Sequence, residues 1–307
     1  MITHYFKTLK DSELKTIDSP RNGVWTHAIN PTDEELAVLV EDFSLDETIV
    51  EDAKDFFEVP RMERSQGATY FFTRYPFDEK KEAIDTAPLL IIMGESFVLT
   101  IALREVPQFE NFLNGKVNIN TTQKAKLFIQ FMDVLTKSYE RELTRLRKAV
   151  HKNRNKLRKI GPQDIERLVN YENELNNMIA AVVPTNTWLN QVTSGNYMQL
   201  YNEDIELMED LMIANSQLVD SARQVLMTIQ NIRSATEAIM TSALNNSIRT
   251  LTVLTILLTI PTIISSLYGM NVDLPFFANP FAFWIILAII FLLVTGTIAV
   301  FKRNEWL

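Results

Sequence analysis

Two long uncharged stretches near the C-terminus constrain this chain more than any other feature. No charged residue occurs in residues 250–272 or 274–301. A bilayer core of ~30 Å requires about 20 apolar residues of helix, and each stretch is long enough. A soluble protein would need a large domain to cover both, and little sequence follows them. The pattern therefore predicts two membrane-spanning helices, at about 248–268 and 281–301.

Charge is distributed unevenly along the chain. Residues 1–120 contain 22 acidic and 12 basic side chains, and residues 121–240 contain 14 and 15. Arg249 precedes the first uncharged stretch, Lys302 and Arg303 follow the second, and the segment between them has no Lys or Arg. Because basic residues favour the cytoplasmic side, we expect a cell-membrane protein with both termini inside the cell and the short loop outside.

The charged body is predicted to be an α+β domain followed by a helical region. Residues 69–77 (TYFFTRYPF) and 88–103 are rich in β-branched and aromatic residues, with a hairpin turn expected at Met93-Gly94-Glu95. Thr32 and Glu35 have the spacing of a capping box at a helix start, and a second helix is expected within residues 44–57. The expected domains are 1–120, a helical region 121–244, and a transmembrane domain 245–307.

The helical region is predicted to contain three long helices. Gly161-Pro162 interrupts the pattern, so helices are expected near 121–159 and 163–193, followed by a stalk helix from about 200 to 267. A mostly apolar set of residues repeats along this stalk at alternating spacings of three and four: Leu211, Asn215, Leu218, Ala222, Val225, Ile229, Ile232, Thr236, Ile239 and Ala243. This heptad pattern favours packing against neighbouring helices of the same or another chain.

The sequence lacks the usual signs of an enzyme or a nucleic-acid-binding protein. It contains no cysteine and no glycine-rich phosphate-binding loop, and its three histidines are scattered. Residues 141–159 hold nine basic side chains against one acidic one, but no aromatic residues are interleaved with them. We interpret this run as a solvated helix that pairs with acidic helices such as 203–210, and we expect no nucleic-acid partner.

Within the first predicted span, polar residues lie on one helical face. At 100° per residue they fall within an arc of about 80°. We call this set the pore stripe; it comprises Thr252, Thr255, Thr259, Thr262 and Ser266, with Asn245 and Ile248 on or near the same face. Hydroxyls on a water-filled axis can contact water or ions. They can also bond back to their own helix or join adjacent spans, as expected for Thr250 and Ser265 off the stripe.

The pore stripe predicts a symmetric homo-oligomer. One helix cannot enclose a pore, and the second span offers little polarity beyond Thr295 and Thr297, so several copies of the first span must surround an axis. Transport through such a pore can be passive. For a divalent cation the membrane potential supplies about 4.6 kcal/mol per 100 mV, which corresponds to a concentration ratio above about a thousandfold.

The first span ends in Tyr268-Gly269-Met270-Asn271, and a short acidic loop leads to a second span followed by a basic pair. This arrangement resembles the CorA family of divalent-cation channels, whose signature is Gly-Met-Asn at this place. The resemblance covers the architecture of the whole chain and is sharpest over residues 245–307. Mg²⁺ gives up water reluctantly. The resemblance therefore implies a ring of Asn271 side chains that accepts the hydrated ion, with Gly269 allowing a bend and Met270 bracing the loop.

The resemblance also implies a funnel-shaped homopentamer that intracellular Mg²⁺ closes. Asn245 matches the inner pore-mouth asparagine, Leu251 the hydrophobic constriction and Thr262 a pore threonine. Asp210 matches a stalk aspartate that helps to hold a regulatory Mg²⁺, with Asp78 or Asp85 of a neighbouring copy as its partner; the alternative is that Asp210 belongs to a solvated helix face. Asp273, at the outer mouth, raises the local cation concentration. The sequence departs from some relatives at Thr259 and Ser266, and its basic C-terminal run is shorter.

Other functions are compatible with the same architecture. The cargo can be Zn²⁺, as in ZntB relatives and with proton coupling, or Co²⁺, Ni²⁺ or Mn²⁺; methionine at the middle motif position favours the magnesium branch. A membrane-anchored sensor or scaffold without conduction is the alternative from another class of protein. It leaves the pore stripe and Asn271 without a role, and the presence or absence of a pentamer in detergent distinguishes the two.

Overall fold

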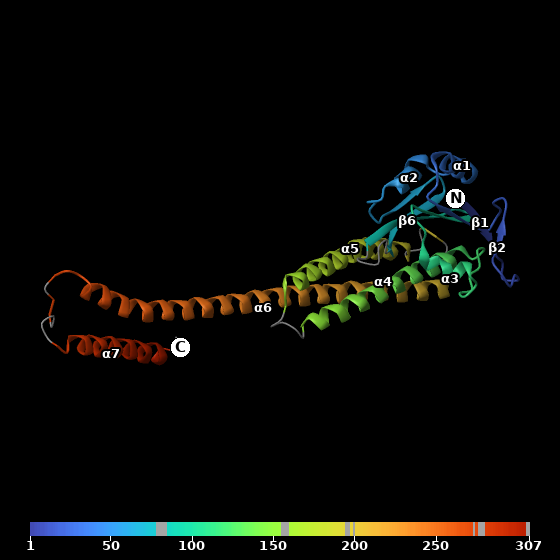
Figure 1. Cartoon of the computed structure of the whole chain (residues 1–307). Helices are drawn as coiled ribbons and strands as arrows, with labels where there is room; N and C mark the ends of the chain where they lie inside the picture. Colours follow the sequence, from blue (N-terminus) through green and yellow to red (C-terminus); the bar gives the residue numbers. More distant parts are fainter. Residues whose placement is uncertain are drawn as a thin grey trace. The chain divides into compact units, whose positions relative to one another are not determined.

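The computed structural model describes residues 1–77, 85–154, 160–193, 197–198, 200–272, 274–275 and 280–304. The chain forms two compact units, Met1–Ile232 and Arg233–Leu307. Figure 1 shows the elements of both units coloured along the sequence. The predicted division at residues 120 and 244 stays a prediction.

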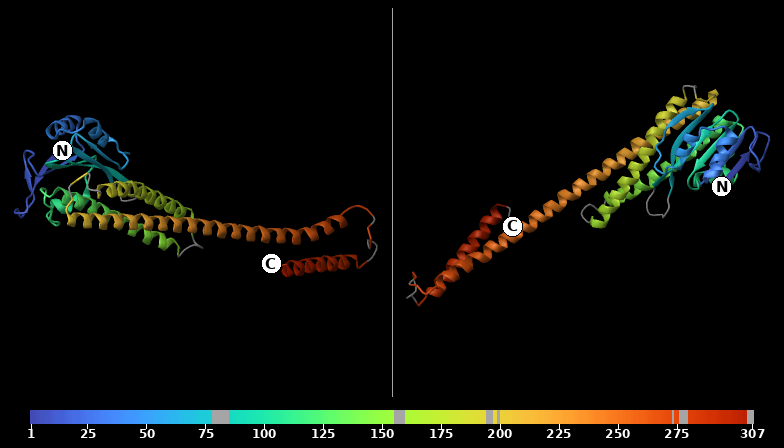
Figure 2. Two further views of the ribbon diagram at one scale, coloured as in Figure 1. Left: turned by 180° about the vertical axis from the view of Figure 1, so that it is seen from behind. Right: turned by 90° about the horizontal axis from the view of Figure 1, so that it is seen from above.

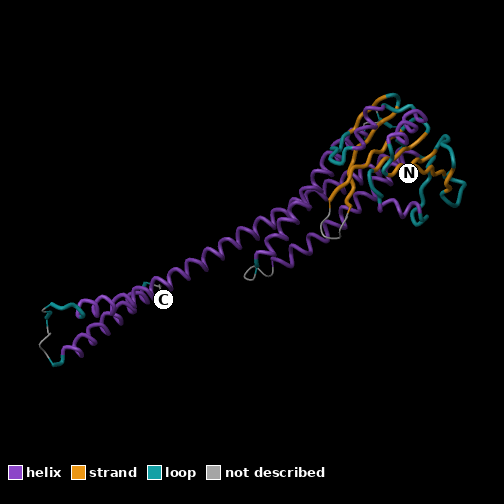
Figure 3. Tube along the Cα trace, turned by 45° about the horizontal axis from the view of Figure 1, so that its top comes forward, coloured by secondary structure: helices purple, strands orange, loops and turns teal. Residues whose placement is uncertain are grey.

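The first unit is built on a seven-stranded sheet (Figure 3). The strand order is β2-β1-β3-β7-β6-β5-β4, and the described pairs are antiparallel except β3 with β7. The expected hairpin at Met93-Gly94-Glu95 joins β6 to β7, and the Gly94 N–H donates to the Phe97 carbonyl at 3.1 Å. The strands are β1 (Ile2–Phe6), β2 (Lys15–Ile17), β3 (Val24–Ile29), β4 (Met62–Ser65), β5 (Ala68–Phe77), β6 (Asp85–Met93) and β7 (Phe97–Ala102).

Both faces of this sheet are covered, which explains why its central strands are almost continuously apolar. Successive residues point to opposite faces, so Phe71 belongs to one core and Phe72 to the other. Helices α1 (Asp33–Phe43) and α2 (Glu47–Glu51) cover the Phe72 face. The expected capping box is present: the Thr32 hydroxyl accepts from the Glu35 N–H at 3.2 Å, and the Glu35 carboxylate accepts from the Thr32 N–H at 3.0 Å.

The second helix expected within residues 44–57 is shorter than predicted. It comprises α2 and a single 3-10 turn, η1 (Asp52–Lys54), and residues 55–57 form a turn instead. The Asp55 carboxylate accepts from the Phe57 N–H at 2.8 Å. A local bond of this kind competes with helical hydrogen bonding, so the helix ends before it.

Helices on the other face complete an aromatic core (Figure 1). They are η2 (Pro107–Phe109), α3 (Glu110–Leu113), α4 (Lys124–Arg154) and α5 (Pro162–Val192). Trp25 of β3 lies against the rings of Phe109 and Phe131, with centroid distances of 5.7 and 4.9 Å. Aromatic pairs at these distances add to the stabilisation from apolar burial. This core fixes the start of the helical region against the sheet.

Helices α4 and α5 also pack against α6 (Asn202–Tyr268), the stalk helix predicted from the sequence. The heptad residues of α6 in the first unit, from Leu211 to Ile232, are buried. Their neighbours include Leu143 and Leu146 of α4 and Leu175 of α5. The partners of this stripe therefore belong to the same chain. The burial does not extend to Ile239, which is 38% exposed.

The second unit consists of the end of α6 and helix α7 (Ala282–Arg303), which Figure 2 shows from two further sides. Both helices are long and apolar enough to cross a membrane by length and composition. Only 6% of the apolar window in α6 and none of that in α7 is buried within the chain. Core helices of soluble proteins are mostly buried, so this exposure favours the membrane interpretation.

Candidate functional site: a polar face of helix α6

The hydroxyl groups of the pore stripe bond back to their own helix. Thr252, Thr255, Thr259 and Thr262 each donate to the carbonyl four residues earlier, at 2.7–2.8 Å. The same bond was expected of Thr250 off the stripe, where it measures 3.0 Å. A hydrogen bond to the carbonyl four residues earlier is therefore made both on and off the pore stripe, and it does not distinguish the two sets of residues. It uses the hydroxyl proton, so each oxygen presents lone pairs, which suits a cation or the protons of its hydration water.

An exposed face of α6, polar except at Ile213 and Met227, continues the spacing of the pore stripe toward the start of the helix. From Glu203 to Ser234, exposed residues repeat at spacings of three and four on the side away from the buried heptads. The spacing continues without a break through Ala238 and Thr241 to Asn245. We call these residues the upper stripe: Glu203, Glu206, Asp210, Ile213, Gln217, Asp220, Gln224, Met227, Asn231 and Ser234. The periodicity is present in the sequence, but the heptad residues on the opposite face are more uniformly apolar and give the stronger signal.

The Gly-Met-Asn motif forms a turn directly after α6. The Gly269 N–H donates to the Ser265 and Ser266 carbonyls at 3.0 and 3.3 Å, and the Met270 N–H donates to the Leu267 carbonyl at 3.2 Å. Gly269 does not have a positive φ. A Cβ added there would lie 3.4 Å from the nearest atom, the Ser265 carbonyl oxygen. Neither the backbone conformation nor a close contact within one chain therefore requires glycine at position 269.

The other motif residues face outward from the chain. Met270 is 53% exposed and Asn271 is also exposed. The bracing contact expected of Met270 stays a prediction. Asp273 lies outside the described residues.

A side-chain hydrogen bond closes the turn around the motif. The Tyr268 hydroxyl donates to the Pro275 carbonyl at 3.1 Å. It links the last residue of α6 to a residue beyond the motif, and the motif lies in the loop so closed. This role of Tyr268 could not be predicted from the sequence, because only the folded turn shows what the hydroxyl contacts.

The structure describes two of the three candidate regulatory residues, Asp210 and Asp85. Asp210 is exposed on the upper stripe. Asp85 begins β6, and its carboxylate accepts from the Thr86 N–H at 2.7 Å and from the Asn177 amide of α5 at 3.4 Å. Asp78 lies outside the described residues. Among the residues that the structure describes, no three or more His, Asp or Glu side chains are grouped to hold a metal ion.

Within the basic run, Arg145 pairs with residues other than those expected. Arg145 of α4 pairs with Glu142 at 2.9 Å and with Glu174 of α5 at 2.5 Å, rather than with residues 203–210. Glu174 is 3% exposed, so the pair joins α4 to α5 at a buried position. Residues 155–159 of the run lie outside the described residues.

Together these features define a class of protein: an α+β unit with a helical bundle, whose long last helix ends in an apolar segment followed by a second apolar helix. The family model of the CorA-like Mg²⁺ transporter protein matches residues 21–303. The chain belongs to this family, and the resemblance drawn from the Gly-Met-Asn motif is confirmed. The family is one of membrane transporters for divalent cations, not of enzymes.

Known relatives match over nearly the whole chain. The cobalt/magnesium transport protein CorA of Methanocaldococcus jannaschii is 24% identical over 92% of this chain and 91% of its own. The complete structure of the CorA magnesium transporter from that organism covers 100% of this chain and 99% of its own, with 20% identity and a TM-score of 0.89. The full-length CmaX protein has a TM-score of 0.79 at 15% identity, over 99% and 97% of the two chains. The predicted fold class is therefore confirmed.

Proposed function

We propose that this protein is a passive Mg²⁺ channel, formed by a homopentamer around an axis lined by α6 and driven by the membrane potential. The observation that carries this proposal is the pore stripe of α6, which continues the spacing of the upper stripe and leads to the exposed Gly-Met-Asn turn. The pore stripe and the upper stripe share one spacing over nine heptads between Glu203 and Ser266.

The spacing of this face supports an arrangement around an axis. A strict seven-residue repeat drifts by about 20° per heptad on a straight α-helix, which amounts to about half a turn over nine heptads. The residues stay on one side only if the helices wind around each other with a left-handed twist. From Leu211 to Ile232, packing against α4 and α5 of the same chain already maintains this register. The support for an axis therefore comes from its continuation through the pore stripe, in the apolar segment of α6.

The motif suits selection of a hydrated ion. Asn271 would offer neutral amide oxygens, which accept hydrogen bonds from bound water without stripping it from Mg²⁺. A carboxylate ring would hold a divalent cation more tightly and slow its release. Tyr268 would fix the turn that presents Asn271, through its bond to the Pro275 carbonyl.

Gating would involve Leu251 and Asp210. The Leu251 side chain is 65% exposed in the single chain, so copies around the axis would form an apolar ring that excludes water when narrow. With Mg²⁺ bound between copies at Asp210, the ring stays closed. Loss of intracellular Mg²⁺ leaves like charges unscreened, and their repulsion widens the ring. The acids of the upper stripe, such as Glu206 and Asp220, would add to this repulsion.

Uptake into liposomes containing purified full-length protein tests the proposal. With an inside-negative potential and a dye that reports Mg²⁺ inside, we expect Mg²⁺ entry that internal Mg²⁺ suppresses. Asn271→Ala should abolish entry, whereas the matched control Asn246→Ala, next to the stripe residue Asn245, should not. Absence of Mg²⁺ entry in the wild type would favour a non-conducting scaffold. Equal entry through Asn271→Ala and Asn246→Ala would show that Asn271 does not take part in ion selection.

Co²⁺ is the second candidate cargo. The relative from Methanocaldococcus jannaschii is described as a cobalt/magnesium transport protein. Co²⁺ also has an octahedral hydration shell, so an amide ring that recognises hydrated Mg²⁺ would accept it. Competition between the two ions for entry in the same liposomes decides whether they share the pathway.

A further inference from the structure

The buried face of α6 contains one polar residue in the first unit. From Leu211 to Ile232 the heptad residues are apolar except Asn215, which is 2% exposed. The Thr136 hydroxyl of α4 donates to the side-chain oxygen of Asn215 at 2.9 Å. The Asn215 amide nitrogen is also buried, and it has no hydrogen-bond partner among the residues that the structure describes. A buried donor left in this state costs stability, so the asparagine requires an explanation.

The buried faces of α4 and α6 have the same spacing, which alternates between four and three residues. The buried α4 residues are Met132, Thr136, Tyr139, Leu143, Leu146 and Val150. Each precedes a buried heptad residue of α6 by 79 positions, which is the separation of Thr136 and Asn215. Met132 and Leu211 belong to one apolar cluster, and the later residues of both helices belong to another. The two helices are therefore parallel, and their buried residues lie at matching levels.

Helix α5 also has a buried polar residue at this level. Thr185 is 4% exposed and lies between the α5 residues of the two apolar clusters. Its hydroxyl donates to the Ala181 carbonyl at 2.8 Å and can accept from the Thr73 hydroxyl of β5 at 3.1 Å. We call Thr136, Thr185 and Asn215 the polar layer. It separates the two apolar clusters of the helical bundle.

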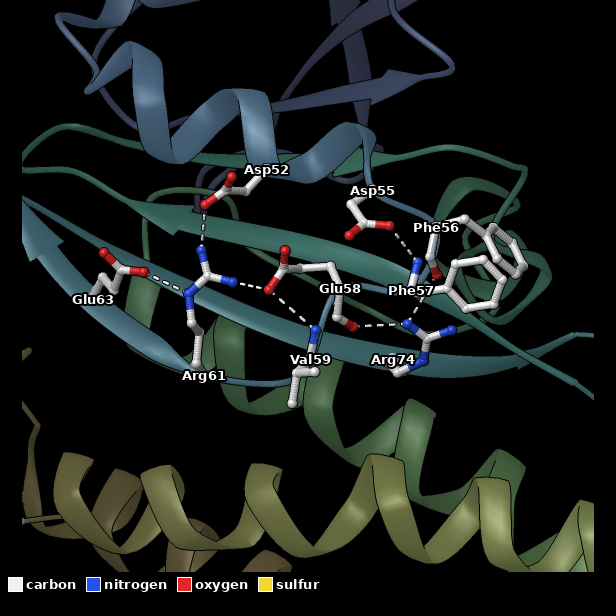
Figure 4. Close-up of polar contacts among 9 residues, drawn as sticks. All are labelled: Asp52, Asp55, Phe56, Phe57, Glu58, Val59, Arg61, Glu63 and Arg74. Atoms are coloured by element: carbon white, nitrogen blue, oxygen red, sulfur yellow. Dashed lines mark hydrogen bonds and ion pairs between the residues drawn. The ribbon is translucent and has the colours of Figure 1, made fainter.

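Helix α4 is fixed to the sheet close to the polar layer. The Tyr139 hydroxyl donates to the Arg74 carbonyl of β5 at 3.0 Å. Figure 4 shows the Arg74 guanidinium reaching the Phe56 and Glu58 carbonyls, to which it donates at 3.0 and 2.7 Å. Thr86 of β6 accepts from the same guanidinium through its hydroxyl and its carbonyl. Because Arg74 is held in this way, α4 provides a fixed reference against which α6 is placed.

The apolar pattern by itself does not select one register of α6 along α4. A slide of α6 by one heptad, about 10 Å at 1.5 Å per residue, changes only the pairs that involve the two polar residues. Asn215 then faces Ile129 or Leu143, according to the direction, and Thr136 likewise faces an apolar residue. Both polar side chains would be buried without their hydrogen bond, which makes a slipped register unfavourable.

We infer that Asn215 is a positioning residue, whose bond to Thr136 fixes the register of α6 along α4. A single buried asparagine specifies register in coiled coils in the same way. Leucine would fit this face without leaving an amide nitrogen unpaired, so stability does not explain the asparagine. Because α6 also carries the pore stripe, its register decides which residues of α6 remain beyond the bundle. The inference goes beyond the proposed function and holds whether or not an ion is conducted.

Spin-label distances in the full-length protein test this register, because the sequence contains no cysteine. Labels on K137C/Q230C occupy exposed positions of α4 and α6, about 21 Å apart along the bundle at 1.5 Å per residue. Labelled chains are mixed with an excess of unlabelled chains, so that distances within one chain dominate. We expect one distance with Asn215 in place. With N215L added, we expect a second distance, shifted by up to about 10 Å.

Two variants serve as controls. T136N/N215T exchanges the two side chains and keeps a hydroxyl-to-amide bond, so it should restore the single distance. Ser216 follows Asn215 but is exposed, and its hydroxyl accepts from the Asn186 amide at 3.0 Å. S216A should therefore keep the single distance. The denaturant midpoint of N215L should equal or exceed that of the wild type, because an apolar side chain replaces a half-paired amide.

An unchanged single distance in N215L would overturn the inference, and a lower midpoint beside it would make Asn215 a packing residue only. A second distance that persists in T136N/N215T, or that appears in S216A, would also overturn it. If N215L does not fold, T136V gives the same test, because it leaves Asn215 unpaired without changing α6. A single unchanged distance in T136V would then refute the role of the bond.

Discussion

Removal of one hydroxyl group, in Tyr268→Phe, tests how the Gly-Met-Asn turn is held. The wild-type hydroxyl donates to the Pro275 carbonyl at 3.1 Å, and phenylalanine keeps the ring without this bond. A neutral hydrogen bond contributes about 0.5–1.5 kcal/mol, equivalent to about a two- to tenfold change in the balance between closed and open turns. If Asn271 binds the ion only in the closed turn, the half-saturating Mg²⁺ concentration should rise by up to that factor.

The maximal flux should not change in this variant, because saturating Mg²⁺ restores the closed turn. Initial uptake rates in liposomes, measured over a range of external Mg²⁺, separate the two parameters. Tyr201→Phe is the matched control, since Tyr201 is 69% exposed in the first unit and far along the chain from the motif. A lower maximal flux with unchanged half-saturation, or no change at all, would refute the role of Tyr268 in positioning Asn271.

Three further predictions follow from named residues. Leu251→Ser should raise the rate of Mg²⁺ uptake into liposomes that contain inhibiting internal Mg²⁺ by about tenfold, if it lowers the barrier to ion passage through the closed ring by about 1.4 kcal/mol. An unchanged rate would exclude Leu251 as the constriction. Asp210→Asn should raise the internal Mg²⁺ needed for half-inhibition several-fold, which a titration of internal Mg²⁺ at fixed potential measures; an unchanged value would remove Asp210 from regulation. Burial lowers the pKa of His27 from 6.5 to about 4. As the pH falls from 7 toward 4, the imidazole of the unfolded chain therefore takes up a proton before that of the folded chain does. Stability should therefore fall by up to about 3 kcal/mol between pH 7 and pH 4. His27→Gln should flatten this dependence in denaturant unfolding, and exposed His151→Gln should not; equal slopes in all three proteins would contradict the assignment.

Local patterns predicted much of this architecture because their causes are local. Thr32 and Glu35 form the capping box that their spacing indicates, and the turn at Gly94 joins two strands as expected. The long helix α6 follows from 3.5-residue periodicity and the absence of Gly and Pro up to residue 260. The motif after Tyr268 sufficed to identify the family, because its position between two apolar helices is specific.

Long-range contacts could not be predicted in the same way. The parallel pairing of β3 with β7 joins Val24 to Phe97, and no local pattern encodes which distant strand becomes a neighbour. The Asp55 carboxylate ended a helix that composition alone extended to Phe57. The bonds of Arg74 to the Phe56 and Glu58 carbonyls likewise depend on the folded sheet. For the candidate site, the sequence supplied the face of α6, whereas the bond between Tyr268 and Pro275 required the folded turn.

The most direct test of the central claim is the driving force for entry into liposomes that contain the wild-type protein. With the proton gradient collapsed and the potential set by potassium, the account predicts Mg²⁺ entry that rises as the inside becomes more negative, because a doubly charged ion gains about 4.6 kcal/mol per 100 mV. Zn²⁺ entry that requires a proton gradient, without Mg²⁺ entry at any potential, would contradict it.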